Sequence, residues 1–106
     1  MSLAANDDLI WLASWFGIRA NHDGPRITLQ TLDNPGWILS VELPTLETKD
    51  EVIFSEGAVP SAANGNIGGN DWLECRIRSG RLVVAGDPTK LPKLFRAARD
   101  YLEHLA

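Results

Sequence analysis

The sequence predicts an α+β fold in which an N-terminal and a C-terminal helix pack on one face of a mostly antiparallel sheet of about five strands. Two observations predict it. Segments near both ends of the chain repeat apolar residues at the spacing of an amphipathic helix, and the segments between them alternate apolar and polar residues as strands do. Two such helices bury their apolar stripes most economically on one face of one sheet. A chain of 106 residues has the length of one domain, so we expect a single domain over 1–106.

The first helix is predicted over about 7–16. Asp7 and Asp8 fall in its first turn, where carboxylates complement the positive end of a helix. Trp11 and Trp15 flank its apolar stripe, so we expect them at the margin of the core rather than in a binding site. Four residues form this stripe, at the i, i+3, i+4, i+7 spacing of a buried helical face: Leu9, Leu12, Ala13 and Phe16.

Two alternating segments, 26–31 and 37–43, follow the first helix and are predicted to form an antiparallel pair. The sequence Leu-Asp-Asn-Pro-Gly-Trp joins them. Pro35 supplies a φ near −65° and Gly36 tolerates a positive φ, which are the requirements of a type II turn. We therefore expect this turn to connect the two strands.

Three further strands are predicted, at 51–55, 71–79 and 81–85. Ser79-Gly80 joins the last two into a second hairpin. The segment 56–70 is rich in glycine and asparagine and has no helical or strand period, so we expect a mobile surface loop. Its composition favours a tolerated insertion over a functional loop.

The last helix is predicted over 91–105. Arg96 and Asp100, and likewise Arg99 and Glu103, are spaced i, i+4, which is typical of a solvated helix face. Its buried stripe is predicted to consist of Leu91, Leu94, Phe95, Ala98, Leu102 and Leu105. The uncovered face of the sheet is where we look for a partner.

Charge is divided unevenly along the chain. The net charge is −4, but up to Cys75 there are eleven acidic residues against three basic ones, and from Arg76 onward three against seven. An acidic surface disfavours nucleic-acid binding and favours a basic partner, although the same charge could serve only to keep a surface solvated. No segment approaches the ~20 apolar residues of a membrane span, and no secretory leader is apparent, so we expect a cytoplasmic protein without membrane contact.

Residues suited to catalysis or metal binding are few. Cys75 is the only cysteine, and it occupies an inward-facing strand position, where a thiol usually stays protonated. His22 and His104 are far apart and lack the spacing of metal ligands. We therefore expect no cofactor, no metal, no catalytic residue and no enzymatic activity.

Four segments, taken together and in order, resemble the immunity protein 53 family of bacterial polymorphic toxin systems. They are WLASWF (11–16), ITLQTLDNPGW (27–37), NDWLECRI (70–77) and AGDPTKLPKLF (85–95). The family positions that this chain matches are Trp11, Leu12, Trp15, Phe16, Asp33, Asn34, Pro35, Gly36, Trp37, Asp71, Trp72, Cys75, Gly86, Asp87, Pro88 and Leu91. The chain departs from the family in two places: 17–26 lacks a Trp-containing acidic stretch, and the segment 56–70 is longer than usual.

The resemblance implies an immunity protein of toxin-antitoxin type, which binds a cognate toxin stoichiometrically and needs no catalytic residue. A basic nuclease domain would suit the acidic charge, and the free protein is expected to be a monomer or a weak homodimer. We expect Asp33, Asn34, Pro35, Gly36, Trp37 and Cys75 to be structural. The candidates for the toxin interface are Trp72, Glu74, Arg76, Glu42, Glu47, Asp50 and Glu51.

An alternative remains open on the residues alone. The sole cysteine lies within a motif, so the chain could instead be a small-molecule-binding or thiol-dependent enzyme domain centred on Cys75. Reactivity of the thiol in the folded protein would distinguish the two readings. The sequence does not identify the toxin, its activity, or whether binding covers its active site or another surface.

Overall fold

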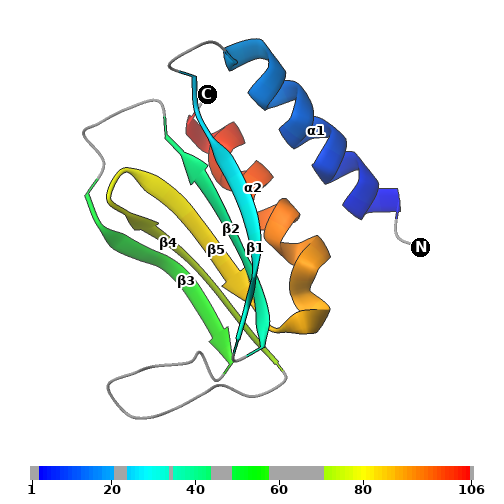
Figure 1. Cartoon of the computed structure of the whole chain (residues 1–106), viewed down its shortest axis with the longest axis vertical. Coiled ribbons are helices and arrows are strands. Elements are labelled where there is room, and N and C mark those ends of the chain that lie inside the picture. The colour runs from blue at the N-terminus through cyan, green and yellow to red at the C-terminus, as the bar shows by residue number, and fades with distance from the viewer. Residues whose placement is uncertain (1–2, 21–23, 34, 44–48, 58–70, 106) are drawn as a thin grey trace.

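The computed structural model describes residues 3–20, 24–33, 35–43, 49–57 and 71–105. Helix α1 precedes five strands, and a 3₁₀ turn η1 leads into helix α2 (Figure 1). All neighbouring strands are antiparallel, in the order β1-β2-β5-β4-β3. The elements are α1 (Leu3–Arg19), β1 (Ile27–Leu32), β2 (Gly36–Glu42), β3 (Glu51–Gly57), β4 (Trp72–Arg78), β5 (Arg81–Gly86), η1 (Pro88–Lys90) and α2 (Leu91–Leu105). The predicted α+β class is confirmed.

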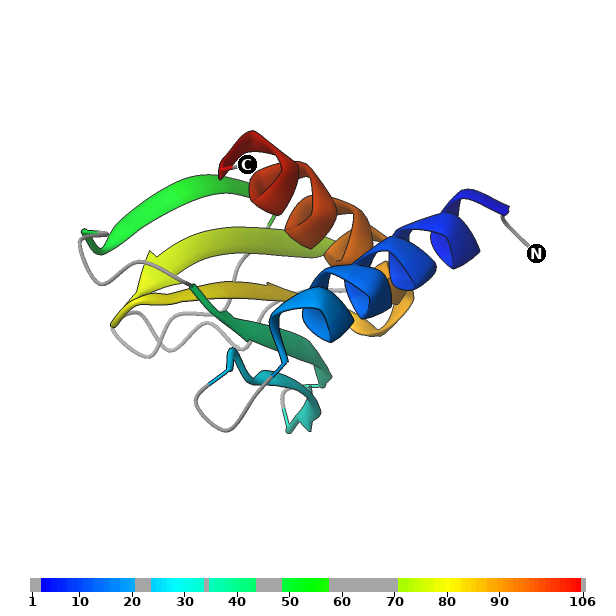
Figure 2. The same cartoon turned by 90° about the horizontal axis from the view of Figure 1, so that it is seen from above.

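Both helices lie on the same side of the sheet, with α1 beside α2 (Figure 2). Helix α2 packs over β2 and β5, the two central strands nearest to it, whereas α1 packs mainly on α2. The opposite face of the sheet carries no helix within the described residues (Figure 1). The expected arrangement of two helices on one face is therefore present, but α2 is centred on one half of the sheet.

Strand alternation determines the core. Residues at every second position of β2, β4 and β5 turn toward the helices, and the intervening residues face the other way. The fully buried side chains from these strands and α2 are Leu39, Val41, Cys75, Ile77, Leu82, Val84, Leu94, Ala98 and Leu102. The predicted alternation of β2 and β4, with Cys75 facing inward, is confirmed.

The second hairpin, between β4 and β5, is also confirmed. Arg78 pairs with Arg81, and the two residues between them, Ser79 and Gly80, have φ values of 53° and 75°. Positive φ at both central positions is the geometry of a type I′ turn, whose twist matches that of the flanking strands.

Helix α1 differs from its prediction in length and in its buried face. It begins at Leu3, so Asp8 is not in the first turn. Leu12 and Trp15 are buried, but Leu9 is 47% exposed, and Ala13 and Phe16 are exposed as well. The reason is that α1 rests on α2 instead of lying flat on the sheet, and this contact turns the tryptophan side of the helix inward.

Helix α2 has the predicted bounds, and its outer face carries the predicted ion pairs. Arg96 lies 3.3 Å from Asp100, and Arg99 lies 2.7 Å from Glu103. The buried stripe is shifted slightly, because Ala97 is buried while Leu105, at the last turn, is exposed.

Strand β3 is longer than predicted. It runs to Gly57, so the expected loop cannot begin at 56, and the remainder of that segment, 58–70, lies outside the described residues. The pairing of β3 with β4 shifts between Val52 and Phe54, which is a β-bulge. None of the described helices is long and apolar enough to cross a membrane.

Candidate interaction surface

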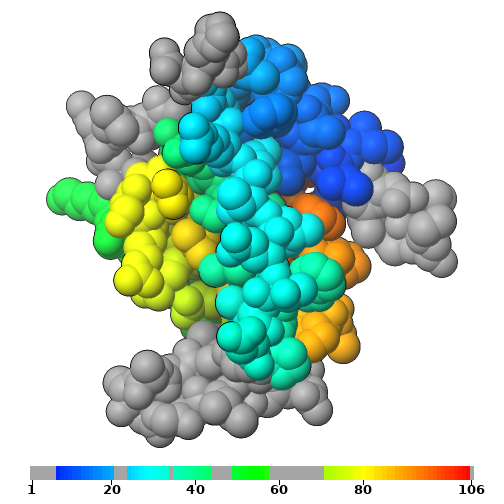
Figure 3. Space-filling view, viewed as in Figure 1, coloured from blue at the N-terminus to red at the C-terminus, as the bar shows by residue number. Residues whose placement is uncertain are grey.

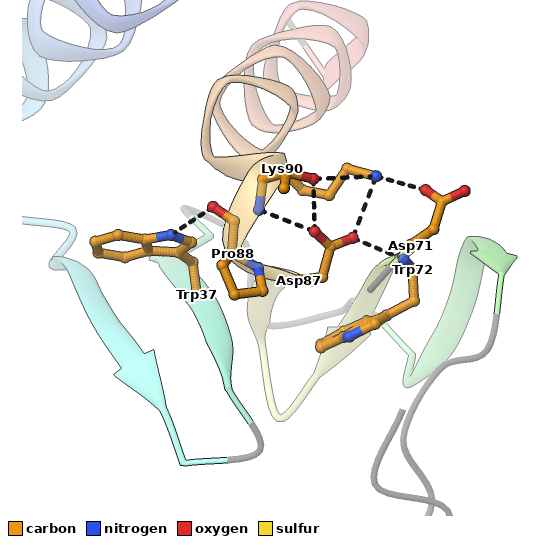
Figure 4. Close-up of polar contacts among 7 residues, drawn as sticks. Trp37, Asp71, Trp72, Asp87, Pro88 and Lys90 are labelled. Atoms are coloured by element: carbon orange, nitrogen blue, oxygen red, sulfur yellow. Dashed lines mark hydrogen bonds and ion pairs between the residues drawn. The ribbon is translucent and has the colours of Figure 1, made fainter. Parts of the chain in front are cut away.

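Three of the four motifs that resemble a known family meet at one end of the sheet, where β5 leads into η1 and α2 (Figure 4), and the fourth, 11–16, lies on α1. We call this cluster the strand-helix junction and define it by Trp37, Asp71, Trp72, Asp87, Pro88 and Lys90. The indole Nε1 of Trp37 donates a hydrogen bond to the carbonyl oxygen of Pro88 at 3.2 Å, across 51 sequence positions. The first hairpin is thereby tied to the entry of the last helix.

Asp87 is the centre of the strand-helix junction and is fully buried. One carboxylate oxygen accepts a hydrogen bond from the backbone N–H of Trp72 at 2.8 Å, and the other accepts from the N–H and hydroxyl of Thr89. The ammonium group of Lys90 lies 3.2 Å away and also contacts Asp71. Asp87 thus caps η1 and fixes the start of β4 with one side chain.

The protonation state of Asp87 follows from these contacts. Burial alone disfavours the charged carboxylate, but the hydrogen bonds from the Thr89 hydroxyl, the N–H groups of Trp72 and Thr89, and Lys90 outweigh it. The pKa of Asp87 is therefore held well below its usual value. The carboxylate is already fully engaged within the chain, so it serves the fold and is not available as an acid or base.

Gly36 belongs to the same end of the sheet, but not for the reason the sequence suggested. Leu32 pairs with Gly36, so Gly36 is already part of β2, and its φ is not positive. The expected type II turn with a positive φ at this residue is therefore wrong. A Cβ at Gly36 would overlap the carbonyl oxygen of Gly86 and lie 3.3 Å from the ring of Trp72, so close packing is what requires glycine here.

The other positions predicted to be structural fall into two groups. Asp33 and Pro35 are exposed in the turn between β1 and β2, and Asn34 lies outside the described residues. Cys75 is 1% exposed in the core, where burial and the charge of Glu74 raise its pKa to about 11. A thiol with this pKa is protonated at neutral pH, which argues against a nucleophilic role.

The predicted interface candidates do not form one cluster. Trp72 is 3% exposed and belongs to the strand-helix junction, so its ring cannot serve as a surface anchor in this structure. Glu42 accepts a hydrogen bond from the N–H of Arg26 and lies 3.8 Å from Arg81, while Asp50 accepts one from the N–H of Ser79. Both carboxylates are thus occupied by contacts that hold the sheet ends together.

Three candidates remain available to a partner. Glu74 and Arg76 form an ion pair at 3.5 Å on the helix-free face of β4. Glu51 is exposed at the start of β3. Glu47 lies outside the described residues. The available candidates therefore belong to the β3 and β4 half of the sheet.

The helix-free face carries a mixed patch, of which the sequence predicted only Glu74 and Arg76. Two rows of paired residues cross the sheet: Ile38, Ala85 and Glu74 in one, and Ser40, Val83 and Arg76 in the other. All six are partly exposed. We call them the open-face patch, and Figure 3 views this side of the molecule. The sequence signal for this patch was the presence of apolar residues at outward-facing strand positions, chiefly Ile38 and Val83.

A groove of about 870 Å³ lies on the other side, between β3 and α2. We call it the β3-α2 groove. Its apolar lining comes from Ile53 and Phe54 of β3, Leu73 and Cys75 of β4, and Ala97 and Tyr101 of α2. Glu51, Glu56, Lys93, Arg96, Asp100 and His104 surround it. No cluster of three or more possible metal ligands occurs among the described residues.

The arrangement defines an α+β domain whose sequence motifs build a strand-helix junction and whose open surfaces lie elsewhere. The sequence model of one family, Immunity protein 53, matches residues 9–103. Because this match covers nearly the whole chain, the chain belongs to the Immunity protein 53 family. Comparison with curated proteins and with solved structures finds no match.

Proposed function

We propose that this chain neutralises a cognate bacterial toxin by binding it stoichiometrically, and that it does so without catalysis. The observation that carries the proposal is its membership of the Immunity protein 53 family over residues 9–103. The buried thiol of Cys75 supports a binding role over a thiol-dependent enzyme, because its raised pKa keeps it protonated at neutral pH.

A neutralising protein needs a rigid scaffold, charge that steers encounter, and anchors that slow release. We propose that the contact surface lies around the edge strand β3 and its neighbour β4, with Glu51 exposed on the helix-bearing face and Glu74 and Arg76 on the helix-free face. The open-face patch supports this placement, since partly exposed apolar side chains of β2 and β5 lie beside the Glu74 and Arg76 pair. An apolar centre with charged neighbours is a common composition for a protein interface.

The proposed partner is a basic toxin domain, with a nuclease as one candidate. The net charge of −4 supports a basic partner because opposite charges raise the rate of encounter. We further propose that the free protein acts in the cytoplasm, as a monomer or a weak homodimer, and that it binds no nucleic acid.

Co-expression tests the proposal. The toxin encoded beside this chain is expressed in a sensitive bacterial host, with and without the chain, and survival is measured. We expect the wild-type chain to restore growth and to co-purify with the toxin. If the toxin kills equally in the presence of the folded chain and no complex is recovered, the proposed function is wrong.

A further inference from the structure

The β3-α2 groove exists because α2 does not cover the whole sheet. Helix α2 packs over β2 and β5, and β3 is the edge strand on the far side of β4. In Figure 2, β3 curves toward the side of the sheet that carries α2. The helix-bearing face of the sheet therefore ends in an open channel and not in packed core.

The bulge in β3 increases the apolar surface of this groove. Val52 pairs with Arg76 and Phe54 pairs with Cys75, so Ile53 is left out of the register between them. Ile53 lines the groove and is 38% exposed, and Phe54 beside it is only partly buried. Exposing two large apolar side chains at one site is unfavourable, and a partner that covered them would gain binding free energy.

Charge in the groove is unbalanced at one end. Glu56 pairs with Leu73 near the end of the sheet where α2 begins, and Lys93, in the first turn of α2, lines the same groove. At the other end Asp100 is already paired with Arg96. Glu51 has no ion-pair partner within the part of the chain that the structure describes.

Glu51 also faces the lining of the groove. Glu51 and Tyr101 line the same groove, and burial, followed by the charge of Glu51, raises the pKa of the Tyr101 hydroxyl. Most other carboxylates on the same half of the molecule are engaged: Glu74 pairs with Arg76, and Asp50 accepts a hydrogen bond from Ser79. Among the described residues, Glu51 is thus a carboxylate without an ion pair at the edge of an apolar channel.

We infer that the β3-α2 groove receives a segment of the toxin that places an apolar side chain against Ile53 and Phe54 and a lysine or arginine beside Glu51. This inference rests on the proposed function and names the site and the chemistry of the partner. The apolar lining favours an apolar side chain that becomes buried in the groove. The Glu51 carboxylate at the edge of the groove favours a cation, and partial exclusion of water there strengthens the ion pair.

Two pairs of matched variants test the inference. Ile53→Ser removes an apolar side chain from the groove, and its control Ile10→Ser makes the same change at an exposed position of α1. Glu51→Lys reverses the charge at the groove, and its control Asp7→Lys makes the same change on α1. All four sites are exposed, so the variants are expected to fold, which thermal unfolding verifies.

The measurement is the dissociation constant for the toxin encoded beside this chain. We expect Ile53→Ser and Glu51→Lys to weaken binding about tenfold or more, and both controls to bind within about threefold of wild type. If wild type binds and the folded groove variants bind equally well, the groove inference is overturned while the proposed function stands. If wild type forms no complex, both are overturned.

A second copy of this chain is the competing occupant. Sedimentation of the wild-type chain alone measures whether it forms a dimer. A monomer at the concentrations used for toxin binding supports the inference, whereas a dimer that Ile53→Ser dissociates and Ile10→Ser does not would overturn it.

Discussion

At the scale of single residues, Asp87 shows how a buried charge is stabilised by the contacts around it. A carboxylate removed from water is costly unless hydrogen bonds and a counter-charge replace the lost solvation. Here the N–H of Trp72, two donors of Thr89 and the ammonium of Lys90 supply them. Because these donors come from β4 and η1, one side chain directly after β5 holds the two elements together.

Replacing Asp87 with Asn is expected to destabilise the fold. The amide keeps the size of the side chain but loses the charge. Its N–H₂ group would face other hydrogen-bond donors, which can make no hydrogen bond to it. We expect a loss of about 3 kcal/mol in the free energy of unfolding at pH 7, measured by urea denaturation. Asp71→Asn is the control: Asp71 also contacts Lys90 but is 89% exposed, so we expect a loss below about 1 kcal/mol.

The contribution of Asp87 is expected to depend on pH in one direction. Its pKa is lower in the folded protein than in the unfolded chain, so the folded state binds fewer protons. The stabilisation is complete above the unfolded pKa of about 4 and is lost as pH falls through the folded pKa. The gap in unfolding free energy between wild type and Asp87→Asn should therefore narrow below about pH 4. A gap that is constant from pH 7 to pH 2.5 would contradict this assignment.

Cys75 provides the test of the enzymatic alternative. Burial and its raised pKa predict that the thiol does not react with iodoacetamide at neutral pH while the protein is folded. It should react fully once the chain is unfolded in urea, as mass spectrometry would show. Rapid alkylation of the folded protein would instead support a thiol-dependent activity.

At the scale of elements, the contact between the two helices depends on an acidic residue of α1. Asp8 is buried and lies 3.4 Å from Arg96 and 3.2 Å from Arg99 of α2. Arg99 also sits over the ring of Trp11, at 5.7 Å from its centroid. These contacts link Asp8 and Trp11 of α1 to the two arginines of α2. They hold the side of α1 that carries the tryptophans toward α2.

Asp8→Asn is expected to loosen α1 from α2. Both arginines retain access to water, so we expect the free energy of unfolding to fall by about 1–2 kcal/mol, which is less than for a fully buried ion pair. The neighbouring Asp7 is exposed, and Asp7→Asn should change stability by less than about 0.5 kcal/mol. Urea denaturation measures both variants. Equal stability of the two variants would show that the helices are held by apolar packing alone.

The elements illustrate what local sequence can and cannot predict. Strand alternation and the bounds of α2 were predictable, because a buried face imposes a period of two or of 3.6 on the chain. The face of α1 was not, because its orientation depends on Arg96 and Arg99, about ninety positions away. Gly36 was recognised as necessary but for the wrong reason, since its close approach to Gly86 is a tertiary contact.

At the scale of the whole molecule, the strand-helix junction and the surfaces open to a partner are separate, although the motif segment 70–77 contributes residues to both. The strand-helix junction uses its polar groups internally, through Trp37, Asp87 and Lys90. Its role is to fix the end of the sheet from which β3, β4 and α2 extend. A short motif can therefore identify the family without contacting the toxin.

The candidate site was predicted only in part, for a geometric reason. Glu51, Glu74 and Arg76 remain available, but Trp72 is buried and Glu42 and Asp50 are engaged within the chain. The open-face patch and the β3-α2 groove depend on strand register, a bulge and the lateral position of α2. None of these is set by a local stretch of sequence.

Isothermal titration of the purified toxin encoded beside this chain with the wild-type chain tests neutralisation by binding most directly. We predict a saturable titration with one chain bound per toxin, and growth rescue in cells that express the two proteins in the same ratio. No heat and no complex with folded protein, or protection at a ratio far below one chain per toxin, would contradict stoichiometric neutralisation.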